Sequence, residues 1–441
     1  MISAAGEIER LLAPIVRGPL PVRLTAWDGS TAGPPDAPRV TVSSPDALRR
    51  QLWACGELGA AQAYVTGEID VDGDLGAALE EVWAVVRSRE LGGVRPTPRT
   101  MLRVLTAAWR LRIIGLPPRR PESQARLRGR PHAMSRDRAA ITHHYDLSNE
   151  FYRILLDPTM AYSCAFFARN VPGAPADPDY GIEDAQRDKL DLVCRTLGLR
   201  PGMRLLDVGC GWGSLSIHAA AEYGARVVGI TLSEQQKAFA QARVAQYGLD
   251  DFVDIRLQDY RTLADRDFDA AASLEMGEHV GDGNYPRFAR TLFEAVRPGA
   301  PVLIQQMSRA GQHRGGGAFI ESFIAPDMTM RPLGQTVALL EEAGLEVRQV
   351  RAMREHYVWT LDAWIATLEA RWDQVVALVG EEVARVWRLY LVGARLSFAQ
   401  GRMGVDQIVA TRPVEPGLAP ARRDGTSRDP MTASGHRAGS G

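Results

Sequence analysis

The chain has 441 residues, 45% of them hydrophobic, and a formal net charge of −1 at pH 7. This size allows two or three domains, and the near-neutral charge argues against wholesale nucleic-acid binding. The cysteines at positions 55, 164, 194 and 210 form no CxxC pair, so we expect neither a metal site nor a disulfide framework. No apolar run reaches the roughly 18 residues that cross a bilayer, and the N-terminus lacks the charged region followed by an apolar core that is typical of a secretory signal. We therefore expect a cytoplasmic protein that touches the inner face of the cell membrane only peripherally.

Residues 1–94 predict a small N-terminal accessory α+β domain. Helical periodicity appears at residues 8–13, 45–55 and 75–89, and residues 22–27 and 39–43 read as strands. This region contains no catalytic constellation. We interpret it as a packing or dimerisation module, and we expect a homodimer.

Residues 95–138 predict a basic linker, because they contain twelve arginines, two acids and several prolines. Within it, residues 100–114 predict a helix in which Trp109 and aliphatic residues alternate with arginines. Such a helix suits the surface of an anionic membrane, and it equally suits packing on the protein with a solvated arginine face. The arginines of this helix are Arg103, Arg110 and Arg112.

Residues 139–412 alternate strand and helix, which predicts a doubly wound parallel α/β sheet with ligands at the carboxyl ends of the strands. The expected strands are residues 205–208, 226–230, 253–257, 270–274, 301–305 and 347–353. The expected helices are residues 214–223, 234–247, 285–296, 333–343 and most of 357–397. We expect the tail, residues 413–441, to be disordered because Pro, Gly, Ser and charged residues dominate it.

The segment LLDVGCGWG, residues 205–213, reads as a buried strand that runs into a glycine turn and then a helix. Glycine allows backbone N–H groups to approach a ligand closely, so the turn predicts a nucleotide-type site. A dinucleotide fold would place an acid at the end of the following strand. Because Thr231 stands there, the sequence disfavours NAD.

Six motifs in register resemble the cyclopropane-fatty-acyl-phospholipid synthase family. They are THHYDLSNEFY (142–152), MAYSCAFF (160–167), LDVGCGWG (206–213), GITLSEQQ (229–236), GEHVG (277–281) and HYVWTLDAW (356–364). The resemblance extends over residues 140–410. It is strongest to actinobacterial members that methylate oleoyl phospholipids on the way to tuberculostearic acid. It implies a class I methyltransferase (Rossmann-like) fold with helical lid elements.

The family resemblance implies that S-adenosylmethionine is the cofactor. The glycine turn would face its methionine portion, with other polar residues on its amino and carboxylate ends, its ribose and its adenine. The implied cofactor-binding residues are Tyr162, Ser163, Gly209, Gly211, Gly213, Thr231, Gln236, Asp259 and Tyr260.

The implied reaction is attack of an alkene on a sulfonium methyl group, which leaves a carbocation and then requires a base. The family is similar in holding a bicarbonate ion as this base, here between Glu278, Tyr357 and Cys164. Aromatic faces can stabilise the cation. The candidates are Tyr145, Tyr162, Phe166, Phe319, Phe323 and Tyr357.

This chain departs from the family at the end of the fifth expected strand, where Gln305 and Met307 stand in a QQM segment in place of HTI. Gln305 can donate a hydrogen bond but cannot change charge near neutral pH, so we expect the fate of the cation to change. A 10-methylene chain from an oleoyl phospholipid is the favoured product, with a possible downstream reductase. The alternatives are a cyclopropane product, a small-molecule methyltransferase, and a lipid-binding protein without catalysis.

Overall fold

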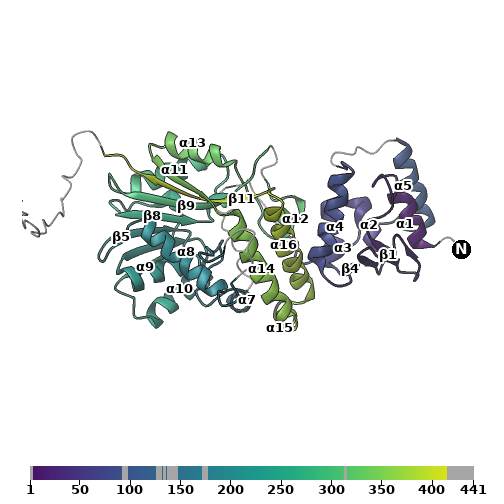
Figure 1. Cartoon of the computed structure of the whole chain (residues 1–441), viewed down its shortest axis with the longest axis horizontal. Helices are drawn as coiled ribbons and strands as arrows, with labels where there is room; N and C mark the ends of the chain where they lie inside the picture. Colours follow the sequence, from purple (N-terminus) through teal and green to yellow (C-terminus); the bar gives the residue numbers. More distant parts are fainter. Residues whose placement is uncertain are drawn as a thin grey trace, which may run out of the picture.

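The computed structural model describes residues 3–91, 98–125, 132, 136, 148–170, 177–311 and 315–414. Two parts lie side by side (Figure 1). The smaller part contains the N-terminal helices and a four-stranded sheet, and the larger part is built on a seven-stranded sheet.

The N-terminal part is an α+β unit whose strand order is β2-β1-β3-β4, with β1 parallel to β3 and the outer pairs antiparallel. The predicted helices and strands are present. Helix α3 was not predicted, because it is apolar on most sides and so lacks the one-sided period of a surface helix. The elements are α1 (Ala4–Leu12), β1 (Arg23–Ala26), β2 (Thr31–Ala32), β3 (Arg39–Val42), α2 (Asp46–Trp53), α3 (Glu57–Val65), β4 (Ile69–Val71), α4 (Leu75–Ser88) and α5 (Pro98–Arg110).

The larger part has strand order β10-β11-β9-β8-β5-β6-β7, in which β5 to β9 are mutually parallel and β11 runs antiparallel to both neighbours. The strands are β5 (Arg204–Val208), β6 (Arg226–Thr231), β7 (Val253–Leu257), β8 (Ala270–Leu274), β9 (Pro301–Ser308), β10 (Glu346–Ala352) and β11 (Gly404–Thr411). The helices are α7 (Asn149–Leu155), α8 (Ile182–Thr196), α9 (Ser214–Tyr223), α10 (Glu234–Gln246), α11 (Tyr285–Ala295), α12 (Ala318–Phe323), α13 (Leu333–Glu342), α14 (Arg354–Ala370), α15 (Trp372–Val379) and α16 (Glu381–Ala399), with short 3-10 turns η1 (Tyr260–Thr262) and η2 (Gly277–His279).

Strand β11 corrects the sequence analysis, which predicted six strands in this part and a wholly parallel sheet. The strand carries Asp406 and Gln407 in its middle, so its sequence does not read as a buried strand. Both side chains are buried because they hydrogen-bond inside the sheet, Asp406 accepting from Ser308 Oγ at 2.6 Å and Gln407 donating to Gln305 Oε1 at 2.9 Å. Tertiary partners thus override the polar pattern.

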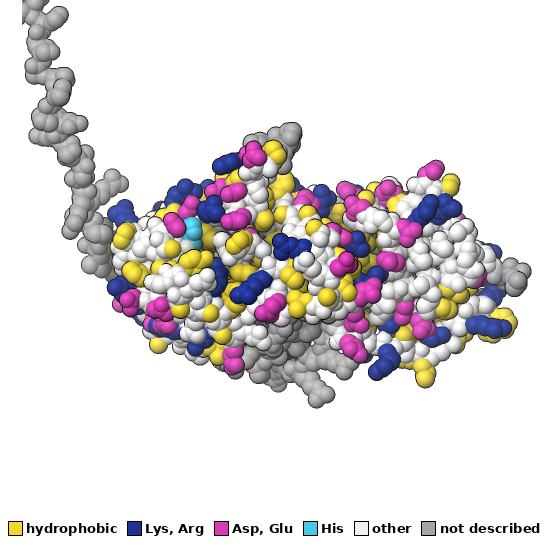
Figure 2. Space-filling view, turned by 90° about the horizontal axis from the view of Figure 1, so that it is seen from below, with side chains coloured by type: hydrophobic (Ala, Val, Ile, Leu, Met, Phe, Trp, Pro, Cys, Tyr) yellow, Lys and Arg dark blue, Asp and Glu magenta, His cyan; other side chains and the backbone are white. Residues whose placement is uncertain are grey.

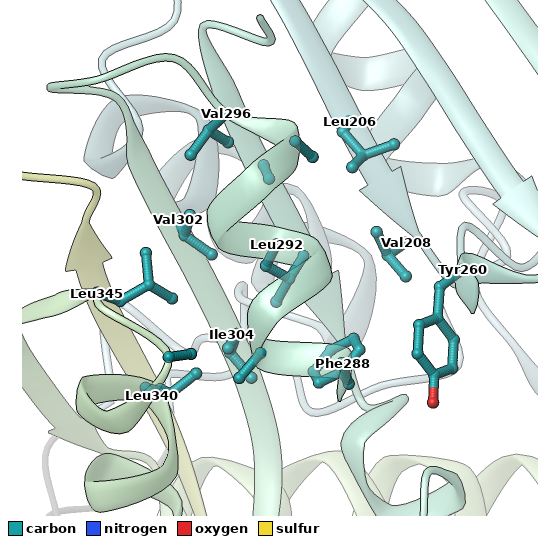
Figure 3. Packing of buried hydrophobic residues seen from close by; sticks show 14 of the residues in the cluster. Leu206, Val208, Tyr260, Phe288, Leu292, Val296, Val302, Ile304, Leu340 and Leu345 are labelled. Atoms are coloured by element: carbon teal, nitrogen blue, oxygen red, sulfur yellow. The ribbon is translucent and has the colours of Figure 1, made fainter. Parts of the chain in front are cut away.

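Apolar layers cover both faces of this sheet. Helices α11 and α13 pack on one face, where Phe288, Leu292 and Leu340 meet Val302 and Ile304 of β9 (Figure 3). Helices α8, α9 and α10 cover the other face with a second buried cluster. This two-sided burial confirms the doubly wound α/β fold and explains why the central strands are almost continuously apolar.

Helix α16 joins the two parts. The Arg385 guanidinium on this helix donates to Tyr64 O at 2.7 Å, Ile69 O at 2.9 Å and Asp70 Oδ1 at 3.1 Å, all in the N-terminal part. Beside it, Phe319 and Phe323 of α12 pack on α3. The contact is therefore both apolar and hydrogen-bonded.

Figure 2 shows acidic and basic side chains interspersed over the face that it views, on both parts of the chain. Within the described ranges, no helix combines the length and the apolar character that a bilayer crossing requires. Tyr145 and the first six residues of the THHYDLSNEFY motif lie outside the described residues, as does the tail from residue 415 onward.

Candidate active site

A pocket opens where the carboxyl ends of β5, β6 and β8 meet, as expected for a doubly wound sheet. It is lined by the glycine turn, by the loop before α8 and by the segment after β8. Seven of the predicted cofactor-binding residues line it: Tyr162, Ser163, Gly209, Gly211, Thr231, Gln236 and Tyr260.

The glycine turn after β5 requires glycine for two reasons. Gly209 and Gly211 have φ values of +82° and +55°, in the left-handed region that side chains disfavour. A Cβ at Gly209 would also stand 2.9 Å from Met276 Cγ. The turn therefore leaves a cradle that a side chain would fill, and this fits close approach of the cofactor's methionine portion.

Thr231 at the end of β6 is tied to the start of α10. Its hydroxyl donates to Gln236 Oε1 at 2.8 Å and accepts from Ser233 N–H at 3.2 Å, while Ser233 Oγ caps the helix by accepting from Gln236 N–H. Both predicted side chains are therefore fixed at the pocket wall.

Two predicted cofactor-binding residues stand outside the pocket lining. Gly213 is the N-cap residue of α9, where an added Cβ would lie 3.2 Å from Ala240 Cβ, so this glycine allows close packing of α9 on α10. Asp259 forms an ion pair with Arg261 at 2.6 Å, and it is Arg261 that reaches the pocket wall. Their roles in binding remain predictions.

Three of the five predicted catalytic residues, Cys164, Gln305 and Tyr357, converge on Glu275. The sequence analysis did not single out this glutamate. Glu275 follows β8 and lines the pocket. Its Oε1 accepts from Cys164 N–H at 2.7 Å and Gln305 Nε2 at 2.9 Å, and its Oε2 accepts from Tyr357 OH at 2.8 Å. Burial raises the pKa of Glu275, and these three hydrogen bonds oppose the rise.

Glu278 lies beside this cluster and is 1% exposed. Its Oε1 accepts from the backbone N–H of Met307, and its Oε2 has no hydrogen-bond partner among the described residues. Burial, followed by the charge of Glu275, raises the pKa of Glu278 to about 8. Glu278 is therefore the carboxyl group that keeps a proton near neutral pH.

The expected bicarbonate site does not fit this arrangement. Tyr357 and Gln305 donate to Glu275, and so does Cys164, through its backbone N–H. The Cys164 thiol is fully buried, and burial raises its pKa well above the usual range, so the thiol stays neutral. A further anion would have to share these donors with a carboxylate already in place.

Lys189 was also missed. It is one of two lysines in the chain, lies on α8, and is 1% exposed. Its Nζ donates to Ser163 Oγ at 2.9 Å at the pocket wall. Burial lowers its pKa, while the charges of Glu275 and Asp157 oppose this. The sequence contained a signal for each missed residue. Glu275 is an acid directly after a central strand, and Lys189 is a rare lysine on an apolar helix face.

The aromatic candidates within the described residues lie in four different places. Tyr162 belongs to a ring cluster beside the pocket, with Trp364 at 5.3 Å and Trp387 at 6.0 Å between ring centroids. Phe166 stacks on His356. Phe319 and Phe323 pack at the contact with the N-terminal part. Tyr357 is buried, and its hydroxyl group donates a hydrogen bond to Glu275. Tyr162 and Tyr357 are therefore the candidates that lie near the reacting centre.

Comparison with known proteins identifies the family to which the chain belongs. The family described as "Mycolic acid cyclopropane synthetase" matches residues 132–408. The probable fatty acid methyltransferase Rv3720 of Mycobacterium tuberculosis is 36% identical over 402 residues, covering 90% of this chain and 92% of that protein. The tuberculostearic acid methyltransferase UfaA1 of the same organism is 33% identical over 397 residues, covering 88% and 87% respectively.

The crystal structure of the mycolic acid cyclopropane synthase CmaA1, complexed with SAH and CTAB, has a TM-score of 0.57 to this chain at 32% identity. The match covers 62% of this chain and 98% of that one. The chain therefore belongs to the mycolic acid cyclopropane synthetase family and is an S-adenosylmethionine-dependent methyltransferase.

Proposed function

We propose that the protein methylates the double bond of an unsaturated fatty acyl chain in a phospholipid, giving a 10-methylene chain from an oleoyl group. The observation that carries this proposal is the pair Glu275 and Glu278 beside the cofactor pocket, next to apolar and aromatic walls. Transfer to an amine or a hydroxyl group needs a base before or during methylation. An alkene instead loses its proton after methylation, from a cation, which suits a carboxylate in a dry site.

The chain's own residues would orient the cofactor and stabilise the positive charge. When bound, S-adenosylmethionine supplies an electrophilic methyl group. The glycine turn and Thr231 orient it, and the Tyr162 ring cluster lines the neighbouring wall, where an aromatic face stabilises positive charge without reacting with it. The alkene is a weak nucleophile, so the reaction depends on holding it in line with the methyl group in a pocket from which water is excluded.

The methylene product follows from a balanced sequence of steps. C10 of the oleoyl chain takes the methyl group, the C–S bond breaks with its electrons left on sulfur, and the cation forms at C9. A hydride shift from C10 to C9 moves the cation to C10. Loss of a proton from the new methyl group then leaves the exocyclic double bond. Gln305, which is held by Gln407 and donates to Glu275, supports this route because it fixes the carboxylate on one side of the pocket.

Helix α5 supports a bilayer as the place of action. One face of α5 packs on α1 through the buried Ala107 and Ala108, while Leu105 and Trp109 are 55% and 73% exposed. Arg110 pairs with Glu7 at 3.2 Å. The helix therefore satisfies both sequence-based interpretations: it packs on the protein, and its outer face is apolar, as on a membrane-surface helix. The homodimer, the reductase and the cytoplasmic location remain predictions.

The test is incubation of the purified protein with S-adenosylmethionine and vesicles of dioleoyl phosphatidylglycerol, followed by gas chromatography and mass spectrometry of the methyl esters. We expect an ester 14 mass units heavier than methyl oleate, which catalytic hydrogenation converts to a methyl-branched ester. Absence of any methylated acyl chain would refute the proposal.

A cyclopropane ester is the second candidate product, because the GEHVG segment and Tyr357 are retained and the matched structure is a cyclopropane synthase. It has the same mass as the methylene ester. Hydrogenation distinguishes the two, since the methylene group takes up hydrogen under conditions that leave the ring intact.

A further inference from the structure

Glu275 stands at the position where an anionic base would be held. Its two carboxylate oxygens accept all three hydrogen bonds described above, from Cys164 N–H, Gln305 Nε2 and Tyr357 OH. We propose that Glu275 is the catalytic base of this enzyme and that its carboxylate replaces a bound bicarbonate ion. This inference deepens the proposed function and rests on it.

The position of Glu275 relative to the pocket distinguishes it from the catalytic residues predicted from the sequence. Glu275 lines the pocket together with Ser163 and Gly209, as expected of a base next to the transferred methyl group. Glu278, Tyr357 and Gln305 are not among the lining residues. Tyr357 and Gln305 donate to the Glu275 carboxylate, and Glu278 acts on it only through its charge, which makes all three positioning residues.

The backbone at Glu275 gives independent support. Its φ is +52°, in the left-handed region that glycine adopts freely and that a glutamate adopts at a cost in free energy. The residue is held there by its backbone N–H, which donates to Gln305 O at 2.6 Å, and by the three bonds to its side chain. Strain of this kind persists where a side chain is needed at one place.

The charges in the cluster favour Glu275 as the ionised partner. Two neighbouring buried carboxyl groups do not both ionise readily. Glu275 accepts three hydrogen bonds and lies near the Lys189 charge, whereas Glu278 accepts one from Met307 and has an unpartnered oxygen among the described residues. The negative charge therefore resides on Glu275 and the proton on Glu278. A bicarbonate ion would add a second negative charge to the same donors.

Glu275 acts as the base in the last chemical step. Glu275 takes a proton from the new methyl group of the C10 cation, and the electron pair of the broken C–H bond forms the exocyclic C=C bond. Glu275 becomes neutral, and it returns the proton to water after the product leaves.

The test compares wild type with Glu275→Gly and Glu275→Gln. Glycine suits the left-handed backbone and leaves a space of carboxylate size, while glutamine keeps the shape and loses the base. Glu90→Gly is the matched control, because Glu90 also has a positive φ, +51°, but is exposed in the N-terminal part. Rates are measured in carbon-dioxide-free buffer with and without added bicarbonate or formate, and cofactor affinity by calorimetry.

We expect wild type and Glu90→Gly to be equally active without bicarbonate. Both Glu275 variants should lose at least about 100-fold in kcat and keep their affinity for S-adenosylmethionine. Bicarbonate or formate should restore activity to Glu275→Gly by at least about 10-fold, and Glu275→Gln should gain nothing. Loss of wild-type activity on removing bicarbonate would overturn the inference, as would full activity of either Glu275 variant.

Binding of ¹³C-labelled bicarbonate, followed by NMR, separates this inference from the proposed function. We expect saturable binding to Glu275→Gly and none to wild type, and this readout needs no turnover. Saturable binding of bicarbonate to wild type would overturn the inference that the Glu275 carboxylate takes the place of this ion. If wild type methylates no acyl chain at all, the proposed function fails and the base role fails with it. The bicarbonate measurement still decides what occupies the anion position.

Discussion

The N-terminal part and the methyltransferase part differ in how they treat buried charge. In the N-terminal part, Arg50 forms a two-bond ion pair with Glu68 at 2.7 and 2.9 Å, and Glu7 pairs with Arg10 and Arg110. In the methyltransferase part, Glu278 keeps an oxygen without a partner among the described residues. In the same part, burial lowers the pKa of Lys189.

This difference teaches where to look for function. Buried charges that neutralise each other stabilise a fold, whereas incompletely paired charges cost stability and mark a site that needs their chemistry. The N-terminal part exposes the apolar Leu105 and Trp109 on α5, which suits a binding surface and not a reaction centre.

The largest expected effect comes from filling the glycine cradle. Gly209→Val places a branched side chain at φ +82°, against Met276, and should weaken S-adenosylmethionine binding by at least about 1,000-fold, about 4 kcal/mol. Gly334→Val on α13, where a Cβ meets nothing within 4 Å, is the control. Calorimetry that shows undiminished affinity for the Gly209 variant would remove the glycine turn from the site.

A second effect concerns the protonated carboxyl group. The pKa of Glu278 is raised from 4.5 to about 8, so the group contributes stability that is fully present below about pH 4.5 and lost as the pH rises towards 8. Glu278→Gln should therefore gain stability over wild type across this window, by up to about 1.4 kcal/mol per pH unit. Urea unfolding at several pH values measures this. The exposed Glu342→Gln change is the control for loss of one charge, and parallel curves for wild type and Glu278→Gln would contradict the burial argument.

Changes at the contact between the two parts should have smaller effects than changes in the candidate active site. Arg385→Met leaves Tyr64 O and Ile69 O without their donor and should cost about 2–3 kcal/mol in unfolding free energy. Arg395→Met breaks the more exposed pair with Asp362 at 2.9 Å and should cost less than about 1 kcal/mol. Equal losses for both variants would show that the buried position of Arg385 adds nothing.

The smallest expected effect is at the outer face of α5. Changing Leu105 and Trp109 together to Gln should reduce binding to anionic vesicles about tenfold, about 1.4 kcal/mol, because their apolar surface no longer enters the lipid interface. A double change of the exposed Leu378 and Phe252 to Gln, in the methyltransferase part, is the control. If sedimentation with vesicles drops equally for both double variants, α5 is not a specific membrane contact.

The parts of the fold that depend on local patterns could be predicted from the sequence. The apolar strands β5 to β9, the amphipathic helices between them and the glycine turn at Gly209 follow from periodicity and backbone chemistry that neighbouring residues determine. The motifs identified the family, and most residues predicted to hold the cofactor line the pocket.

Tertiary structure alone decided three other features. Strand β11 became visible only through the partners that bury Asp406 and Gln407. Glu275 gained its role only when residues as distant as Cys164 and Tyr357 met at one carboxylate. Helix α5 shows an apolar outer face because α1 covers its small residues. In each case the environment of a polar or apolar side chain depends on contacts between segments far apart in the chain, and local periodicity carries no information about such contacts.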